Sequence, residues 1–205
     1  MSKRTLVLGS SSPFRRAILD KLHLDYQVAK PDIDETPLAD EAPQTLVARL
    51  AEQKARAVAK QNPDFANAII IGSDQVAVCD GDILGKPHST AKAVAQLQRF
   101  VGKTVVFLTG LCVYDARTDK ADVICVPFSV KFRNDLTTAE LQQYVELEQP
   151  LNCAGSFKSE GLGISLFDSL IGDDPNTLIG LPCIELLRML RKHQINPLAG
   201  DNSLA

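Results

Sequence analysis

The sequence predicts an α/β protein. Short runs rich in β-branched residues alternate with segments whose apolar residues recur at helical spacing, as far as about residue 191. No internal repeat, low-complexity tract or Pro/Gly-rich linker interrupts this alternation. The 205 residues suffice for one sizeable core or for two small lobes that share one. We expect a single domain over residues 1–197 and a frayed tail over residues 198–205.

The first half of the chain is expected to open on a buried strand and to carry two helices. Ser12 is a helix-capping residue, and Pro13 suits the first helical position. An aspartate- and proline-rich loop over residues 31–43 comes before the second helix. The predicted elements are a strand at 5–8, a helix at 13–22, a strand at 26–29, a helix at 44–60 and a strand at 68–78.

The second half begins with a hairpin turn, which the pair Asp80-Gly81 predicts. Ser89 can cap the next helix, and Thr137 with Glu140 has the spacing of a capping box. Two long β-branched runs flank a polar turn near Asp119 and are expected to pair antiparallel. The predicted elements are a helix from 89 to 100, strands at 104–114 and 123–132, a helix at 137–147, a strand at 166–170 and a helix at 182–191.

Composition excludes several classes of protein. The net charge of −3 argues against a general nucleic-acid-binding protein, and no apolar run is long enough to cross a membrane or to act as a signal peptide. Five scattered cysteines without a C-x-x-C spacing predict free thiols in a reducing compartment, hence the cytoplasm. The three histidines form no zinc-ligand pattern.

The segment Gly9-Ser10-Ser11-Ser12-Pro13-Phe14-Arg15-Arg16 predicts an anion site. Backbone N–H groups, the positive end of the helix dipole and the hydroxyls of Ser10 and Ser12 converge where the helix starts. Arg15 and Arg16 add two cations, so an oligophosphate is the expected ligand. The Gly-Lys-Ser/Thr ending of a Walker A loop is missing. The alternative is an ordinary capped helix whose arginines face water.

Two charged residues fall where a core is expected. Lys54 shares a helical stripe with apolar residues, and Asp74 interrupts a strongly β run after Gly72 and Ser73. Functional sites are where local sequence rules tend to break. The alternatives are a lysine whose ammonium reaches water and a structural aspartate bonded to a loop backbone. In a regular strand Asp74 and Gln75 face opposite sides, so a shared site requires a bulge or a strand end.

Glu35 and Asp74 are the candidate ligands of a divalent cation, Mg²⁺ or Mn²⁺. Mg²⁺ takes oxygen ligands and often uses only one or two carboxylates beside substrate phosphates. The alternative for the acidic stretch around Glu35 is a solvated loop, and for Asp32 we prefer that interpretation.

Two further segments suit a ligand. Lys86 lies in the rigid turn Gly85-Lys86-Pro87, which suits a phosphate contact, although a lysine in a turn is usually just solvated. The small-residue loop over residues 153–163 allows close backbone approach, and Lys158 and Glu160 in it are candidates to read a base or a phosphate. The alternative is a surface loop with turn glycines. Cys153 lacks an evident activating partner and is not expected to be a nucleophile.

Together these motifs resemble the Maf family of nucleoside triphosphate pyrophosphatases. The motifs that match, in order and spacing, are Ser10-Ser11-Ser12-Pro13-x-Arg15-Arg16, Asp34-Glu35-Thr36, Lys54, Gly72-Ser73-Asp74-Gln75-Val76, Gly85-Lys86-Pro87, Thr109-Gly110 and Gly155-x-x-x-x-Glu160-Gly161. The resemblance spans the chain to about Pro197. It implies an elongated mixed-sheet fold like that of inosine triphosphate pyrophosphatases, with two lobes around a central cleft. It also implies divalent-metal-dependent cleavage of a nucleotide to its monophosphate and pyrophosphate.

The resemblance assigns roles by position. It makes Asp74 the proton acceptor and implies that Glu35 helps to hold the metal. An ordinary aspartate is a weak base at neutral pH, so Asp74 would orient a water whose pKa the metal lowers. The residues expected to bind the phosphates are Ser10, Ser12, Arg15, Arg16, Lys54 and Lys86.

Phe14, Gln75 and Glu160 bear on which base is bound. The branch of the family that acts on dTTP and UTP has an arginine and a glutamine where this chain has Phe14 and Glu160, and the 7-methyl-GTP branch has an aromatic and a glutamate. Methylation at N7 makes guanine cationic, so an aromatic face adds a cation–π contribution of roughly 0.5–2 kcal/mol. A glutamate accepts from the N1–H and N2–H₂ edge. This sequence resembles the second branch, although Phe14 stacks less well than an indole.

The expected function is removal of 7-methyl-GTP from the nucleotide pool by a cytoplasmic hydrolase. The alternatives are dTTP or UTP as substrate, a nucleotide-binding regulator of cell division without catalysis, and a metal-binding α/β domain without turnover. The expected partner is a small nucleotide, not a nucleic acid or a membrane, and the family suggests a homodimer.

Overall fold

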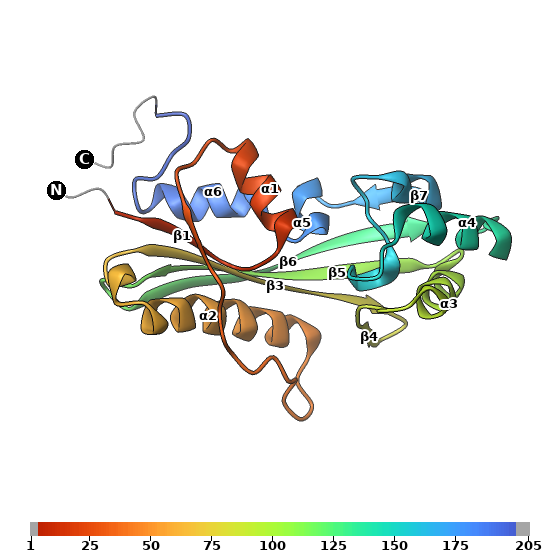
Figure 1. Cartoon of the computed structure of the whole chain (residues 1–205), viewed down its shortest axis with the longest axis horizontal. Helices are drawn as coiled ribbons and strands as arrows, with labels where there is room; N and C mark the ends of the chain where they lie inside the picture. The colour runs from red at the N-terminus through yellow and green to blue at the C-terminus, as the bar shows by residue number, and fades with distance from the viewer. Residues whose placement is uncertain (1–3, 200–205) are drawn as a thin grey trace. The chain divides into compact units, whose positions relative to one another are not determined.

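The computed structural model describes residues 4–199, which contain seven strands, six α-helices and three short 3₁₀ helices (Figure 1). The strands are β1 (Leu6–Gly9), β2 (Gln27–Ala29), β3 (Ile69–Cys79), β4 (Asp82–Leu84), β5 (Thr104–Asp115), β6 (Lys120–Phe132) and β7 (Phe167–Ile171). The helices are α1 (Pro13–Lys21), α2 (Pro43–Gln61), α3 (Thr90–Phe100), α4 (Thr138–Glu148), α5 (Pro175–Ile179) and α6 (Cys183–Arg191).

The strands form one mixed sheet in the order β2-β1-β3-β5-β6-β7, and β4 pairs with β3. Strand β1 runs parallel to β2 and β3, whereas β4 is antiparallel to β3 and β7 is antiparallel to β6. Residues 116–119 join β5 to β6, and so short a connection joins only antiparallel neighbours. The predicted mixed α/β fold is therefore confirmed.

Local sequence signals located most elements to within a few residues. Ser12, Ser89 and Thr137 each accept a hydrogen bond from the first turn of their helices, and Thr137 forms the predicted capping box with Glu140. Asp80 and Gly81 both have positive φ, as the hairpin between β3 and β4 requires. Helix α5 and the short 3₁₀ turns of the second half were not predicted, because segments of three to five residues carry no periodic pattern.

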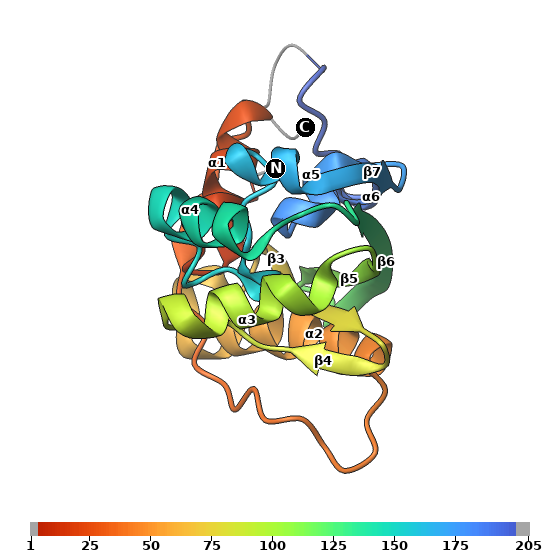
Figure 2. The same cartoon turned by 90° about the vertical axis from the view of Figure 1, so that its right-hand side faces the viewer.

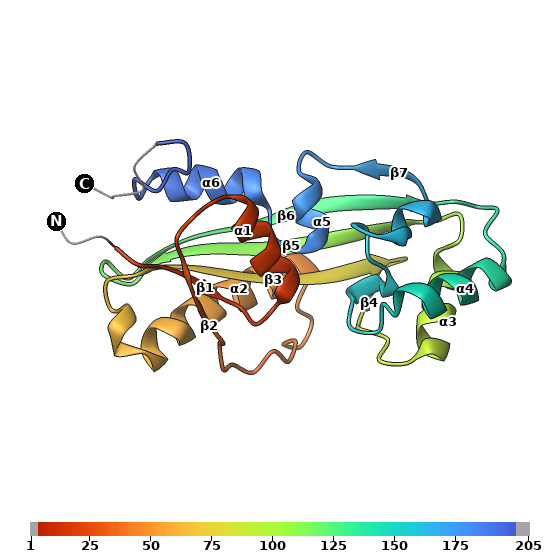
Figure 3. The same cartoon turned by 45° about the horizontal axis from the view of Figure 1, so that its top comes forward.

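The chain divides into two compact units, and β3, β5 and β6 contribute to both. The first unit contains the residues up to Asp74, Thr109–Val126 and the residues from Gly180 on. In it, α2 covers one face of the sheet, and α1 and α6 lie on the other face (Figures 1 and 3). The α2 side is closed by apolar residues of the helix and the strands, among them Val7, Ala55, Val58 and Ile70.

Two glycines let α2 approach the sheet of the first unit closely. A Cβ atom on Gly72 of β3 would lie 2.0 Å from the carbonyl oxygen of Ala51, and one on Gly110 of β5 would lie 2.0 Å from that of Val47. Any side chain at either position would push the helix away. A glycine inside a strand is typical of such a close backbone approach.

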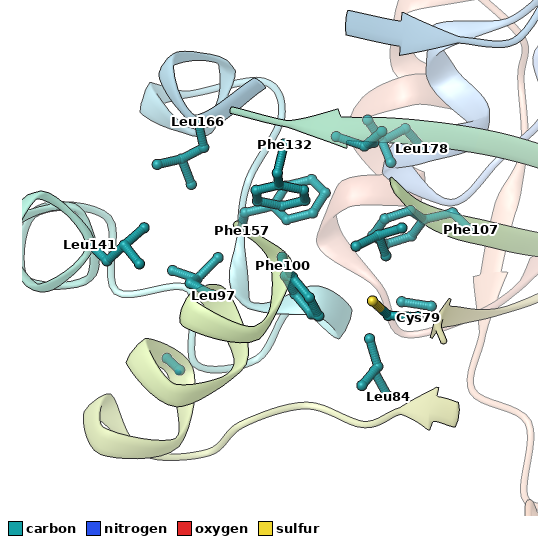
Figure 4. Packing of buried hydrophobic residues seen from close by; sticks show 14 of the residues in the cluster. Cys79, Leu84, Leu97, Phe100, Phe107, Phe132, Leu141, Phe157, Leu166 and Leu178 are labelled. Atoms are coloured by element: carbon teal, nitrogen blue, oxygen red, sulfur yellow. The ribbon is translucent and has the colours of Figure 1, made fainter. Parts of the chain in front are cut away.

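The second unit contains Gln75–Leu108 and Pro127–Ile179. Helices α3 and α4 lie side by side in it (Figure 2). Its core is rich in phenylalanine: the ring centroid of Phe157 lies 5.3 Å from that of Phe107 and 5.6 Å from that of Phe132, both edge to face (Figure 4). The ring centroid of Phe167 lies 4.9 Å from that of Phe157, also edge to face. Leu97 and Phe100 of α3 and Leu141 of α4 pack into the same cluster.

An ion pair ties the start of the described chain to the end of β5 in the first unit. The Arg4 guanidinium donates to both carboxylate oxygens of Asp115 and to the carbonyl of Asn67. Burial raises the pKa of Asp115, but the hydrogen bonds from Arg4 outweigh this and lower it to about 2. His193 Nδ1 lies 3.8 Å from the same carboxylate. No helix within residues 4–199 is both long and apolar enough to cross a membrane.

Gly72→Ala is expected to destabilise the fold by about 1–3 kcal/mol, because the new methyl group overlaps the carbonyl of Ala51 and overpacking has this cost. The matched control is Gly85→Ala, where a Cβ atom meets nothing within 4 Å and φ is not positive. Urea denaturation of both variants measures the effect. Equal stability of the two would contradict the close approach of α2.

Asp115→Asn is expected to cost about 2 kcal/mol at pH 7, since the pKa of Asp115 falls from its ordinary value of 3.8 to about 2 on folding. A depressed carboxyl pKa stabilises the fold above the unfolded value and ceases to do so as the pH falls through the folded value. The difference between wild type and variant should therefore disappear between about pH 4 and pH 2. Denaturation at several pH values, with the exposed Asp64→Asn as control, measures it; a difference that persists at pH 2 would refute this origin.

Candidate functional site

The loop between β1 and α1 forms a basic, hydroxyl-lined turn. Ser10 Oγ accepts from the Ser12 backbone N–H at 3.2 Å and from Arg15 Nη1 at 3.3 Å. Ser12 Oγ caps α1 by accepting from the Arg15 backbone N–H at 3.4 Å. Arg15 Nε donates to the Gly180 carbonyl at 2.7 Å, and Ser73 Oγ donates to the same oxygen at 2.9 Å. The guanidinium is thus held in place from two sides.

Arg15 is a partly buried cation within electrostatic reach of two carboxylates. Burial lowers the pKa of its guanidinium, and the charges of Asp74 and Glu35 oppose that change. The first unit therefore brings these three predicted residues close to one another. Arg16 is exposed, and its backbone carbonyl accepts a hydrogen bond from Tyr26 Oη at 3.3 Å. Phe14 is partly exposed on the first turn of α1.

Lys54 joins the two predicted metal ligands. Its ammonium Nζ lies 2.6 Å from Asp74 Oδ1 and 3.0 Å from Glu35 Oε1. The side chains of Lys54 and Asp74 are only 8% and 13% exposed, whereas that of Glu35 is 59% exposed. The lysine does not reach out to water: it is buried and paired. Helix α2 supplies the cation, β3 one carboxylate and the loop before α2 the other.

Asp74 and Gln75 point to opposite faces of β3. Asp74 lies on the side of Gly72 and meets Lys54 of α2, while Gln75 Nε2 donates to the carbonyls of Thr177 at 2.8 Å and Leu178 at 3.4 Å. The amide of Gln75 is thus engaged with the backbone of α5 inside the second unit. The role of Gln75 in base selection stays a prediction.

Two other predicted residues, Lys86 and Glu160, lie in the second unit and are exposed. Burial raises the pKa of Cys153, and the charges of Lys158, Glu160 and Lys86 act on the same thiol. These side chains are therefore near one another around Cys153. The raised pKa agrees with the expectation that Cys153 is not a nucleophile.

Lys158 has a structural role. Its ammonium donates to the Glu148 carbonyl and lies 3.8 Å from the Glu148 carboxylate, and its backbone N–H donates to Tyr144 Oη at 3.0 Å. These bonds fasten the 153–163 loop to the end of α4. Glu148 also accepts from the Leu162 N–H at 2.8 Å. Glu160, in the same loop, has an exposed side chain.

Sequence reasoning missed the polar contacts that hold the loop carrying Glu35. Arg49 of α2 donates to both carboxylate oxygens of Glu41, at 2.6 and 2.7 Å, and to the Thr36 carbonyl at 3.2 Å. The hydrogen bond from Arg49 lowers the pKa of Glu41 to about 2. No motif indicates this pair, because an arginine next to buried helix positions usually has a solvated side chain. The contact of Arg15 with the Gly180 carbonyl was also missed, because every residue has a backbone carbonyl and no motif marks this one.

Within residues 4–199 no group of three or more Cys, His, Asp or Glu side chains is arranged to hold a metal ion by itself. Glu35 and Asp74 nevertheless direct carboxylate oxygens at one cation, the Lys54 ammonium, so their donor set suits a hard divalent ion that takes its other ligands from phosphates and water. All five cysteines are free thiols, as predicted.

Comparison with known proteins shows which family this chain resembles over nearly its whole length. A family model described as Maf-like protein matches residues 5–193, and the chain therefore belongs to the Maf family. Among its relatives, a protein of Idiomarina loihiensis is 63% identical over 96% of this chain and 98% of its own length. One of Colwellia psychrerythraea is 57% identical over 98% of each, and one of Vibrio cholerae is 52% identical over 96% and 99%. All three are named 7-methyl-GTP pyrophosphatase.

Lys54→Met is expected to lower the free energy of unfolding by about 2 kcal/mol, because it leaves the carboxylate of Asp74 buried without its ammonium partner. Lys60→Met, on the exposed end of the same helix, is the matched control. Urea denaturation gives both values. Unchanged stability in Lys54→Met would mean that the pair does not stabilise the fold.

Proposed function

We propose that this chain hydrolyses 7-methyl-GTP to 7-methyl-GMP and pyrophosphate, as a hydrolase of phosphoanhydride bonds in the nucleotide pool. The observation that carries the proposal is the identity of 52–63% over nearly the whole length to relatives named 7-methyl-GTP pyrophosphatase. The cluster of Arg15, Lys54, Glu35 and Asp74 supports it, since such residues suit phosphate chemistry.

In this proposal Asp74 orients and deprotonates the attacking water. Its carboxylate is held by Lys54, so one of its oxygens has a fixed position. Arg15, Lys54 and the N-terminus of α1 would offset the negative charge of the triphosphate, with Ser10 and Ser12 donating hydroxyl hydrogen bonds. Arg16 and Lys86, both exposed, are proposed as further phosphate ligands.

A divalent cation, Mg²⁺ or Mn²⁺, is the proposed cofactor, because Maf-family pyrophosphatases are generally dependent on one. Glu35 and Asp74 would hold it, and when bound it would lower the pKa of water and offset phosphate charge. Glu35 is the more exposed of the two, so it has the room to exchange its contact with Lys54 for another cation.

Phe14 and Glu160 are the proposed readers of the methylated base, with Gln75 as a further specificity residue. Phe14 is a partly exposed aromatic, and Glu160 is an exposed carboxylate. A cationic base matches both properties. We further propose a cytoplasmic location, which the five free thiols support, a single functional domain over residues 1–197, and a homodimer. Of the proposed tail 198–205, residues 200–205 lie outside the described part of the chain.

The test is pyrophosphate release from 7-methyl-GTP, GTP, dTTP, UTP and CTP with Mg²⁺, by wild type and Asp74→Asn. We expect 7-methyl-GTP to be hydrolysed fastest and Asp74→Asn to lose at least about a hundredfold in kcat, as expected when a general base is removed. Asp64→Asn, an exposed aspartate of the same unit, is the control and should retain the wild-type rate.

The other outcomes separate the alternatives. Faster release from dTTP or UTP would keep the enzyme class and refute the roles of Phe14 and Glu160. Nucleotide binding without any release would favour a regulator, and metal binding without nucleotide binding would favour a domain without turnover. Full activity in Asp74→Asn would refute the role of Asp74 alone.

A further inference from the structure

The stretch of residues 34–40, in the loop that carries Glu35, buries no apolar side chain. Residues 30–42 connect β2 to α2, and every residue from Asp34 to Asp40 is exposed. Leu38, the one large apolar side chain of that stretch, is 60% exposed. Without apolar burial, a loop of this length is expected to sample many conformations unless polar contacts restrain it.

Arg49 provides these polar contacts. Its Nε and Nη2 donate to the two oxygens of Glu41 at 2.6 and 2.7 Å, and Nη2 also donates to the Thr36 carbonyl at 3.2 Å. Its Nη1 donates to Gln53 Oε1, one turn along α2, at 3.0 Å. All three nitrogens of the guanidinium are thus engaged, and the planar group is fixed to both the helix and the loop.

Glu41 completes the arrangement. Its side chain is only 4% exposed, and Oε2 accepts from the Leu38 N–H at 3.0 Å as well as from Arg49. The Glu41 N–H donates to the Leu38 carbonyl at 3.2 Å, which closes a turn over residues 38–41. The Asp34 carboxylate accepts from the Thr36 N–H at 2.9 Å on the other side of Glu35. The backbone is therefore fastened both before and after Glu35.

We propose that Arg49 and Glu41 form a positioning pair, whose bidentate contact holds the 34–41 loop so that the Glu35 carboxylate meets Lys54 and Asp74. The inference rests on the proposed function, because it gives Glu35 its use. Arg49 and Lys54 lie on one helix, so the cation that holds the loop and the cation that meets Glu35 move together. Arg49 is not a catalytic residue, since all three of its guanidinium nitrogens already bind groups of the helix and the loop.

The test compares Arg49→Gln, Arg49→Lys and the control Arg56→Gln. Arg56 lies on the same helix and also binds a glutamate and a loop carboxylate, Glu52 and Asp119, but makes no contact with the 34–41 loop. Hydrogen–deuterium exchange of residues 34–41 reads the loop without any turnover. We expect faster exchange in Arg49→Gln, partial protection in Arg49→Lys and no change in that loop in Arg56→Gln.

The second arm reads what the loop does for the site. Mn²⁺ binding is measured by electron paramagnetic resonance in the presence of a non-hydrolysable α,β-methylene analogue of 7-methyl-GTP, and the Mg²⁺ dependence of kcat and KM is measured beside it. Arg49→Gln should weaken Mn²⁺ binding on the order of tenfold, the usual effect of removing an outer support of a metal ligand. In a Glu35→Gln background the same change should add nothing, because Arg49 acts through Glu35.

Unchanged exchange of residues 34–41 in Arg49→Gln would overturn the proposal. So would faster exchange with unaltered Mn²⁺ binding, or an Arg49→Gln effect of full size in the Glu35→Gln background. Failure of the proposed function is distinguishable, since a wild type that releases no pyrophosphate from any nucleotide would still give the exchange and Mn²⁺ results.

Discussion

The close contact of α2 with β3 and β5 is the constraint on which the first unit depends. Because Gly72 and Gly110 carry no side chain, the carbonyls of Ala51 and Val47 lie almost on the strands. One turn further along the helix, Lys54 then meets Asp74 at 2.6 Å. If the helix lay farther from the sheet, the ammonium and the carboxylate would be buried without a partner. A buried charge without a partner destabilises the fold, because it has lost its contacts with water and gained none in return.

The balance of charge around Lys54 connects this packing to the proposed function. The ammonium of Lys54 contacts two carboxylates, those of Asp74 and Glu35. Burial lowers the pKa of the Arg15 guanidinium, and the charges of the same two carboxylates raise it. A cluster of this kind offers positive groups to anions and carboxylates to cations. In the function proposed above, the phosphates of a nucleotide and a divalent ion would exchange contacts with these groups without leaving a buried charge unpaired. The exposure of Glu35 suits such an exchange.

Much of the fold could be predicted because its signals are local. Ser12, Ser89 and Thr137 cap helices wherever they precede one, and Asp80-Gly81 favours the same turn in any hairpin. Lys54 and Asp74 were singled out for a different reason: they are charged residues in apolar patterns, and such charges need partners. Helix α5, the Gly180 carbonyl and the Arg49–Glu41 pair follow no local pattern, and the sequence did not reveal them.

The sequence by itself determined the α/β class, most element boundaries, the family and the free thiols, since each depends on residue type and spacing along the chain. Only the tertiary structure decided that Lys54 is paired and does not reach water, that Lys158 is bound to Glu148, and that Arg49 holds the loop of Glu35. These facts depend on atoms brought together from distant parts of the chain. A polar side chain has the same donors in any fold, and packing alone selects which acceptor each one meets.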